Sequence, residues 1–105
     1  MTETEFLEAS EALMRAVENA VDAAGLDVEC DRSGNVLTLE GDSGEQVVIN
    51  RHGPTQQMWL ATRKGGLHFE NKDGQWLNTR DGTSFESALE AALGFVCGEA
   101  VKIKL

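Results

Sequence analysis

The chain has 105 residues and a mass of 11.4 kDa, which suffices for one hydrophobic core, so we expect a single domain over residues 1–105. Its net charge of −9 disfavours nucleic acid and anionic lipid as partners and favours metal ions or basic protein surfaces. No apolar run approaches the ~18 residues of a membrane span. The acidic first ten residues resemble no export or transit signal, so a soluble cytoplasmic protein with no membrane partner is expected.

The acidic residues are concentrated in the first part of the chain. Residues 1–45 hold twelve acids and only two bases, Arg15 and Arg32, whereas residues 46–105 hold six acids and seven bases. So few basic residues cannot form the alternating pairs that stabilise an ordinary charged surface helix. The sequence therefore predicts one strongly acidic surface on an otherwise nearly neutral molecule.

Residues 3–24 predict one amphipathic helix, opened by a capping box of Thr2 and Glu5 and followed by Gly25 as the terminating residue. Apolar side chains recur with the helical period on one side, at Phe6, Ala9, Leu13, Ala16, Val17, Ala20, Val21 and Ala24. Charged side chains occupy the opposite side, at Glu8, Glu11, Arg15, Glu18 and Asp22. The apolar side is predicted to pack on the core.

Six segments after this helix alternate apolar and polar residues with the period of two that is typical of half-buried strands. They are residues 26–31, 36–40, 45–51, 57–63, 67–71 and 75–77. Their connections are short and rich in glycine, as at Ser33-Gly34, Gly65-Gly66 and Asp73-Gly74. Successive hairpins of this kind predict an antiparallel sheet of five to six strands.

A second helix is predicted after Asp81-Gly82, with a capping box of Thr83 and Glu86 at its start and Gly94 at its end. Its apolar residues recur at helical spacing, at Phe85, Ala88, Leu89, Ala92 and Leu93. The tail over residues 101–105 is apolar enough to pack against the helices. The predicted fold class is α+β, a two-layer sandwich with the N- and C-terminal helices on one face of the sheet.

Strand parity leaves the other face of the sheet without a helical cover. The side chains predicted to face the core are Val47, Ile49, Met58, Leu60, Leu67 and Phe69. Trp59 then lies on the open face among Asn50, Gln57 and His68. A large aromatic residue in such polar surroundings is typical of a protein-binding anchor. It is equally consistent with a side chain that packs on a neighbour such as Val48 and only covers the sheet.

The segment NRHGPTQQMWLA over residues 50–61, followed by GGLHF over residues 65–69, resembles the central signature of the frataxin family. The acidic first helix, the acids alternating on the first strand, the turn before Trp76 and the DGTSF start of the second helix complete the pattern. The resemblance covers nearly the whole chain and is closest to the bacterial frataxins. It implies the same α+β fold that the periodicity predicts independently.

The resemblance also implies a function, that of an iron-binding protein of iron-sulfur cluster assembly. Such a protein contacts a cysteine desulfurase and the scaffold protein on which clusters are built, and it regulates their activity or delivers iron. By correspondence with the family, metal contacts are expected at Glu3, Glu18, Asp22, Glu29 and Asp31. Secondary candidates are Glu8, Glu11, Asp27 and His68. Contacts with the scaffold are expected at Trp59, Asn50, Gln57 and Arg51.

The chemistry of the acidic residues is compatible with this function. Carboxylate oxygens and water suit hard cations, and Glu18 and Asp22 lie one helical turn apart, where they can share an ion. Because histidine and thiolate ligands are absent from such a site, Fe2+ or Fe3+ should bind weakly and exchange readily. Other hard divalent or trivalent cations should substitute. A monomer is expected, with metal-driven association as an open alternative.

Two alternatives to iron binding are consistent with the same residues. The acidic helix face can be simply solvated, or the protein can be an acidic docking inhibitor of a basic partner with only incidental metal affinity. An enzyme is not expected, because the sequence shows no nucleophile with a base, no phosphate-binding loop and no closed metal cage. Cys30 and Cys97 lie far apart in no metal-ligand spacing and are expected to be reduced, buried thiols.

Overall fold

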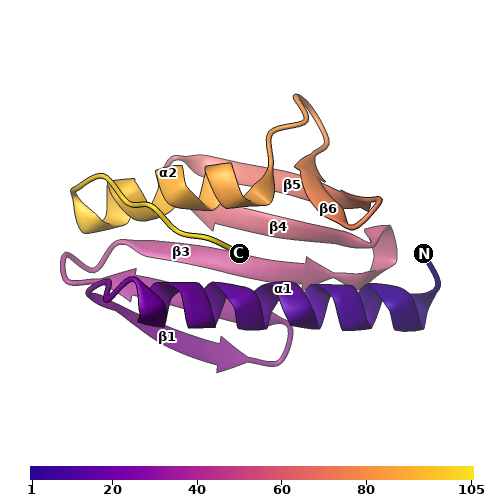
Figure 1. Cartoon of the computed structure of the whole chain (residues 1–105), viewed down its shortest axis with the longest axis horizontal. Helices are drawn as coiled ribbons and strands as arrows, with labels where there is room; N and C mark the ends of the chain where they lie inside the picture. Colours follow the sequence, from indigo (N-terminus) through magenta and orange to yellow (C-terminus); the bar gives the residue numbers. More distant parts are fainter.

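The computed structural model describes residues 1–105 and consists of one helix, six strands and a second helix (Figure 1). Helix α1 spans Glu3–Ala23 and helix α2 spans Phe85–Cys97. The strands are β1 (Val28–Ser33), β2 (Val36–Gly41), β3 (Gln46–His52), β4 (Gln57–Thr62), β5 (Gly65–Lys72) and β6 (Gln75–Asn78), with a short 3-10 turn, η1 (Gly53–Thr55), between β3 and β4. Neither helix combines the length and the hydrophobicity that crossing a membrane requires.

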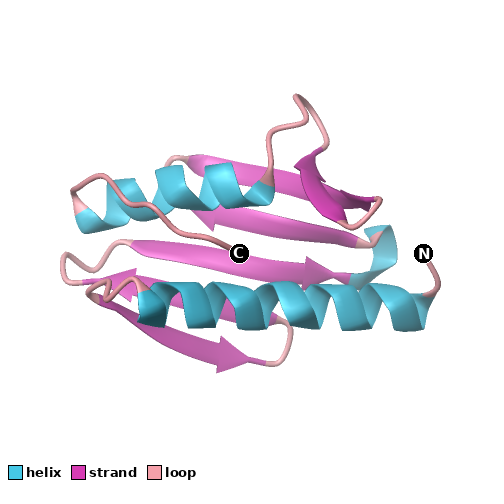
Figure 2. Cartoon of the chain, in the orientation of Figure 1, coloured by secondary structure: helices cyan, strands magenta, loops and turns pink.

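The six strands form one antiparallel sheet in the order of the sequence, from β1 to β6. Both helices lie on the same face of this sheet (Figure 2), and α2 packs mainly against β2, β3 and β6. The opposite face carries no helix. The predicted α+β sandwich is therefore confirmed, and β1 is left as an edge strand next to α1.

The core lies between the helices and the sheet, as strand parity predicts. Five of the six sheet residues assigned to the core are buried: Val47, Ile49, Met58, Leu60 and Phe69. Leu67 is the exception: it is 38 % exposed and lines a groove together with Ala88, Ala92 and Phe95 of α2. Edge-to-face contacts between Phe6 and Trp76 and between Phe69 and Phe85 fix the helices on the sheet.

The helix ends follow local capping chemistry. At the start of α1, the Thr2 hydroxyl accepts a hydrogen bond from the backbone amide of Glu5, and the Glu5 carboxylate accepts one from the backbone amide of Thr2. The predicted capping box is therefore confirmed. The predicted box at α2 is wrong, because the N-cap is Ser84 and its hydroxyl accepts the Ser87 amide. The predicted end at Gly94 is also wrong. The helix continues to Cys97, and Gly98 supplies the left-handed turn with φ 71°.

The last residues run back between the two helices and pack on them (Figure 1). Val101 is buried, and the amides of Ile103 and Leu105 donate to the carboxylates of Glu90 and Glu86 at 2.9 and 2.8 Å. The Glu86 carboxylate therefore anchors the tail instead of capping α2. The expected packing of residues 101–105 against the helices is confirmed.

The two thiols are free, and they differ in exposure. Cys97 is half-buried at the end of α2, but Cys30 is exposed because β1 is an edge strand. The expectation that both thiols are buried is therefore wrong for Cys30.

Candidate metal and partner-binding surfaces

The middle of α1 holds the best-neutralised acid of the molecule, Glu11. Its carboxylate accepts two hydrogen bonds from Arg32 of β1, at 2.7 and 3.2 Å, and lies within 3.5 Å of Arg15 and 3.6 Å of Arg51. The hydrogen bonds from Arg32 hold the pKa of Glu11 below its ordinary value. The Glu11 carboxylate is thus paired with arginines and is not among the unpaired carboxylates that could coordinate a metal ion.

Arg51 is the most enclosed of these three arginines. Only 11 % of its side chain is exposed, and the guanidinium donates to the Ser10 hydroxyl at 3.1 Å, to the Leu7 carbonyl at 3.4 Å and to Asn35 Oδ1 at 3.1 Å. Arg51 therefore ties β3 and the β1–β2 turn to α1, on the helix-covered side of the sheet. Arg51 and Trp59 therefore lie on opposite faces of the sheet, so a partner contact at Arg51 would be separate from one at Trp59.

The acids near the end of α1 have a different environment. Three of the four ion pairs in the protein involve Glu11 and the fourth joins Arg63 to Glu45, so Glu18 and Asp22 have no basic partner within 4 Å. Partial desolvation, together with these two carboxylates, raises the pKa of the Cys30 thiol on the facing side of β1. Glu18, Asp22 and Cys30 therefore lie near one another between α1 and the edge strand.

The acids of β1 point to the opposite face of the sheet. Glu29 and Asp31 flank Cys30 in the strand, and the antiparallel register places Glu40 of β2 directly across from Glu29. Like charges in this arrangement repel one another. The sequence analysis missed Glu40. The position of the turn between the two strands determines which of their residues pair. The turn is at Gly34-Asn35, one residue beyond the predicted Ser33-Gly34, and a correct turn would have paired Glu40 with Glu29.

A second pair of acids crowds the start of β1 and the end of β2. The pKa of Asp42 is raised mainly by a hydrogen bond with Asp27. The negative charges of Asp27 and Glu29 raise it further. No base balances this pair within ion-pair distance. Asp27 therefore lies among the β1 acids, as expected, and Asp42 is a further member that the sequence analysis did not single out.

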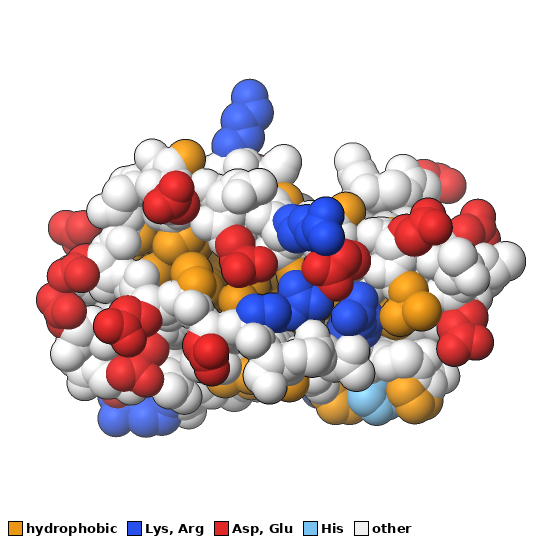
Figure 3. All heavy atoms as spheres, turned by 90° about the horizontal axis from the view of Figure 1, so that it is seen from below, with side chains coloured by type: hydrophobic (Ala, Val, Ile, Leu, Met, Phe, Trp, Pro, Cys, Tyr) orange, Lys and Arg blue, Asp and Glu red, His pale blue; other side chains and the backbone are white.

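These carboxylates gather at one end of the molecule and define what we call the acidic rim. Its members are Glu18, Asp22, Asp27, Glu29, Asp31, Glu40 and Asp42. Figure 3 shows one group of acidic side chains at the end where α1 finishes, further acids at the opposite end, and basic side chains around the middle. No three side chains of the metal-binding types converge closely enough to enclose an ion. An ion on the rim would keep much of its water shell.

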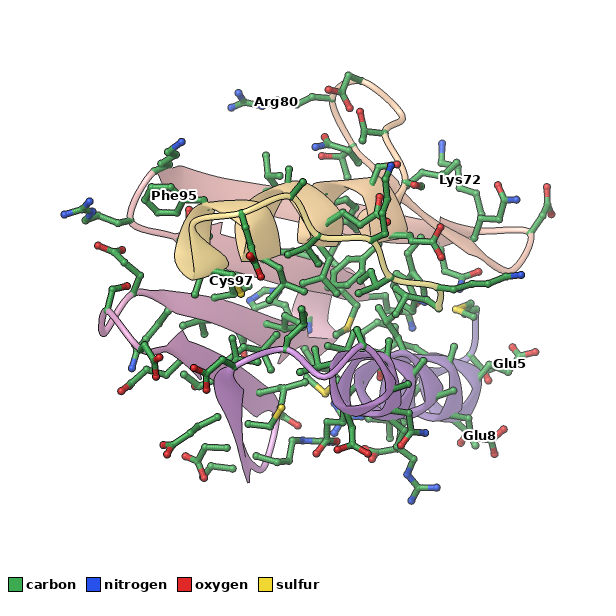
Figure 4. The ribbon with its side chains drawn as sticks, turned by 60° about the vertical axis from the view of Figure 1, so that its left-hand side comes forward. Glu5, Glu8, Lys72, Arg80, Phe95 and Cys97 are labelled. Atoms are coloured by element: carbon green, nitrogen blue, oxygen red, sulfur yellow. The ribbon has the colours of Figure 1, made fainter.

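Glu3 and Glu8 are not part of the rim. They belong to the first turns of α1, and at 1.5 Å per residue Glu3 lies roughly 20 Å along the helix from Glu18. Glu5 and Glu8 point into solvent at that end in Figure 4. The expected metal contacts therefore divide into a group on the rim and an isolated Glu3, which shares no ion with the others.

Replacing Asp42 by Asn should raise the melting temperature at pH 7. Because the pKa of Asp42 is raised in the folded protein, ionisation of its carboxyl group lowers the stability of the fold. This loss of stability is complete above the raised pKa and disappears as the pH falls below the ordinary carboxyl range. The Asn variant should therefore lose its advantage near pH 3, where both proteins carry a neutral side chain. Thermal unfolding at pH 7 and pH 3 measures the effect. A melting temperature at pH 7 below that of the parent would contradict it.

On the open face, Trp59 lies between two histidines. The ring centroids of His52 from β3 and His68 from β5 are 4.0 and 4.5 Å from that of Trp59, each nearly parallel to it at 13°. The indole Nε1 donates to Gln57 Oε1 at 2.9 Å, and Asn50 is the cross-strand neighbour of Trp59. The sequence-based alternative, in which Trp59 packs on Val48, does not include this stack. The predicted strand ends at residue 51, so the pairing of His52 with Gln57 beside Trp59 is not predicted.

The stack leaves the edge of the indole as its accessible part. Because β3 and β5 flank β4, the two imidazoles cover opposite faces of Trp59, and the side chain is half-buried and held in one orientation. His68 is thus a stacking partner on β5, three strands from β2 and roughly 14 Å from the rim at the usual strand spacing. At this distance His68 would not share an ion with the rim.

Comparison with known proteins supports the family assignment. A family model described as a frataxin-like domain matches residues 1–99. A relative from Neisseria meningitidis serogroup B, named iron-sulfur cluster assembly protein CyaY, is 48 % identical over 103 residues, which cover 98 % of this chain and 96 % of that protein. A protein of the same name from Paraburkholderia phymatum is 43 % identical and covers 98 % of both chains. The chain therefore belongs to the frataxin family.

Solved structures agree with this assignment. The frataxin from Psychromonas ingrahamii superposes with a TM-score of 0.91 at 34 % identity, covering 97 % of both chains. A trimeric frataxin from Saccharomyces cerevisiae, described as complexed with ferrous, superposes with a TM-score of 0.66 at 25 % identity and covers 94 % of this chain and 88 % of the other. The two-helix, one-sheet architecture is thus the frataxin fold.

Proposed function

We propose that this chain is an iron-binding protein of iron-sulfur cluster assembly that holds Fe2+ or Fe3+ weakly on the acidic rim. The observation that carries this proposal is the absence of any basic partner within 4 Å of the seven rim carboxylates, while three arginines surround Glu11 alone. The names of the bacterial relatives and the ferrous complex of a yeast frataxin support it.

Electrostatics explains why the rim would take up hard cations. Unpaired carboxylates repel one another, and a cation that binds the folded state relieves this repulsion and stabilises the fold by mass action. Oxygen ligands suit iron and also other hard divalent or trivalent cations. Because no three ligands enclose the ion, binding is weak and exchange is fast. These properties suit regulation or iron delivery, and they do not suit catalysis.

Two partners fit the two surfaces. The rim would meet a basic surface of a cysteine desulfurase, and the open face around Trp59, Asn50 and Gln57 would meet the scaffold protein, in the cytoplasm. The stack with His52 and His68 supports the second contact, because an aromatic anchor that is already held in place loses little entropy on binding. The free protein would be a monomer, and metal bridging between rims offers a route to association.

A cluster-assembly assay that depends on the desulfurase tests the proposal. The protein should change the assembly rate in a manner that depends on added iron, and the double variant Glu18→Gln/Asp22→Asn should weaken this dependence. The variant Glu70→Gln/Asp73→Asn, which removes the same charge outside the rim, serves as the matched control. An iron dependence that is identical in all three proteins would refute the role of the rim.

The second candidate is an acidic inhibitor of a basic partner with incidental metal affinity. The lack of an enclosed metal site is the observation that favours it. Under this alternative the protein slows assembly to the same extent at every iron concentration. The iron titration in the same assay therefore separates the two candidates.

A further inference from the structure

A groove between α2 and the β4–β5 hairpin takes no part in the proposed iron function. Its volume of about 310 Å³ lies at the lower end of the range of about 300–1,000 Å³ that is usual for small-molecule sites. Its apolar lining consists of Leu60, Leu67, Ala88, Ala91, Ala92 and Phe95. Leu67 is one of only three large hydrophobic residues exposed in the protein, so this groove offers apolar surface that the fold itself leaves uncovered.

The side of α2 that faces the hairpin gives the groove its length. Ala88, Ala91, Ala92 and Phe95 recur at spacings of three and four residues, so they lie along one side of the helix. From Ala88 to Phe95 the helix rises roughly 10 Å, at 1.5 Å per residue. The extended chain of a medium-length fatty acid such as octanoate has a similar length. The groove therefore fits a slender apolar tail.

One end of the groove carries an unpaired positive charge. The Lys64 ammonium lies 4.3 Å from the centre of the Phe95 ring, and no carboxylate lies within 4 Å of it. The neighbouring Arg63 is instead paired with Glu45 at 3.2 Å. Figure 4 shows Phe95 on the side of α2 that faces the β4–β5 turn. None of the residues that line the groove is acidic, although the chain has eighteen acids. The end at Phe95 is therefore complementary to one negative charge.

From the lining, the length and the charge of the groove we infer that it binds a small monocarboxylate with an apolar tail, that is, a free medium-chain fatty acid. The carboxylate pairs with Lys64 at the Phe95 end, and the tail lies on Leu67 and the alanines of α2. A single unpaired lysine matches a carboxylate better than a phosphate group, which carries nearly two negative charges. The net charge of −9 repels an anionic membrane surface, so the ligand is a dissolved molecule and not a membrane lipid.

The groove is separate from both surfaces of the proposed function. Strands β4 and β5 lie across the sheet from β1, which carries the acidic rim. The groove is on the helix-covered face, whereas Trp59 is on the open face. A carboxylate in the groove therefore leaves the other two surfaces free. The test needs neither metal nor a desulfurase, so its failure leaves the proposed iron function untouched.

Titration of octanoate into the isotope-labelled, metal-free protein tests the inference. Backbone amide shifts should change and saturate at residues 64–67 and 88–95, while those of α1 and of the residues around Trp59 stay constant. From butanoate through hexanoate to octanoate, the affinity should rise about two- to fourfold for each added methylene, because burial of one methylene contributes up to about 0.8 kcal/mol. Octylammonium, which has the same tail length and the opposite charge, should not bind.

Two pairs of variants locate the site. Lys64→Glu should lower the affinity for octanoate at least about tenfold, since it replaces attraction by repulsion. Lys72→Glu makes the same charge change at the far end of β5 and should bind like the parent. Ala91→Leu fills part of the groove from an exposed position of α2, so the octanoate shifts at residues 64–67 should be lost. Ala23→Leu adds the same bulk at an exposed position at the end of α1 and should keep them.

Each part of the inference has an outcome that overturns it. Amide spectra of all four variants confirm that they are folded, so a loss of binding is not a loss of structure. The inference is overturned if acetate gives the same shifts with the same affinity as octanoate, or if octylammonium binds equally well. It is also overturned if Lys64→Glu or Ala91→Leu binds like the parent, if the shifts map to α1 or Trp59, or if no shift occurs.

Discussion

Replacing Arg51 by Met should destabilise the protein by about 2–3 kcal/mol. The guanidinium is almost enclosed and donates to Ser10, Leu7 and Asn35, and Ser10 is itself fully buried. Methionine keeps most of the aliphatic packing but donates no hydrogen bond, so buried acceptors lose their partner. At this chain length the loss corresponds to a fall in melting temperature of about 10 °C or more. Urea unfolding and calorimetry measure it.

Arg63→Met is the matched control for this prediction. Arg63 is also an arginine in an ion pair, with Glu45 at 3.2 Å, but 74 % of its side chain is exposed. Exposed pairs of this kind contribute less than about 1 kcal/mol. If both substitutions cost the same, or if Arg51→Met leaves stability unchanged, Arg51 does not hold α1 on the sheet and its assignment to the interior is mistaken.

Reversing two charges on the rim should have the largest effect on partner binding. The double variant Glu18→Lys/Asp22→Lys places two cations where the proposed desulfurase contact is basic, so we expect affinity to fall about 100-fold or more. The parent interaction should weaken steeply with salt, because attraction between exposed charges is screened. Isothermal titration or surface-based binding at two ionic strengths measures both effects.

The control for this prediction lies on the same helix. Glu3→Lys/Glu8→Lys makes the same change in net charge, but at the end of α1 that is remote from the rim. Its affinity for the desulfurase should stay within about threefold of the parent, because screening removes most of the long-range effect. Equal losses in the two variants would show that the overall charge, and not the rim, determines binding.

The sequence predicts the parts of this fold that depend on local patterns. The Thr2 capping box, most of the apolar side of α1 and most of the strand parity follow from spacing along the chain and are confirmed. The exceptions are Ala24 and Leu67, which are exposed, and Ser10 and Met14, which are buried although the predicted apolar side omits them. The start of α2 at Ser84 is a local feature that two adjacent hydroxyl residues make ambiguous. Its end at Gly98 instead of Gly94 shows the same ambiguity between two glycines.

The candidate site depends on contacts that spacing cannot predict. The sequence shows Arg15 and Arg32 in the acidic part of the chain, but it does not predict that Arg32 and Arg51 reach Glu11 from strands 21 and 40 positions further along the chain. This pairing removes Glu11 from the free acids and leaves the rim unbalanced. Glu40 enters the rim only through the pairing of β1 with β2, and His52 covers Trp59 only through the pairing of β3 with β4.

The rim also differs from the simple picture of one acidic patch. Glu18 and Asp22 lie on the α1 side of the edge strand, and Glu29 and Asp31 lie on its other side, so β1 separates two groups of carboxylates. A single ion can be shared within a group more readily than between groups. This division suits several weak sites better than one strong site.

The most direct test of the account is paramagnetic broadening of backbone amides by Co2+ or Fe2+. The unpaired carboxylates of the rim predict that amides of residues 18–31 and 40–42 broaden first, while those of residues 3–8 and of β5 stay sharp at the same metal concentration. Broadening that centres on the first turn of α1 or on the histidines around Trp59, or spectra that stay sharp throughout at millimolar metal, would contradict the account.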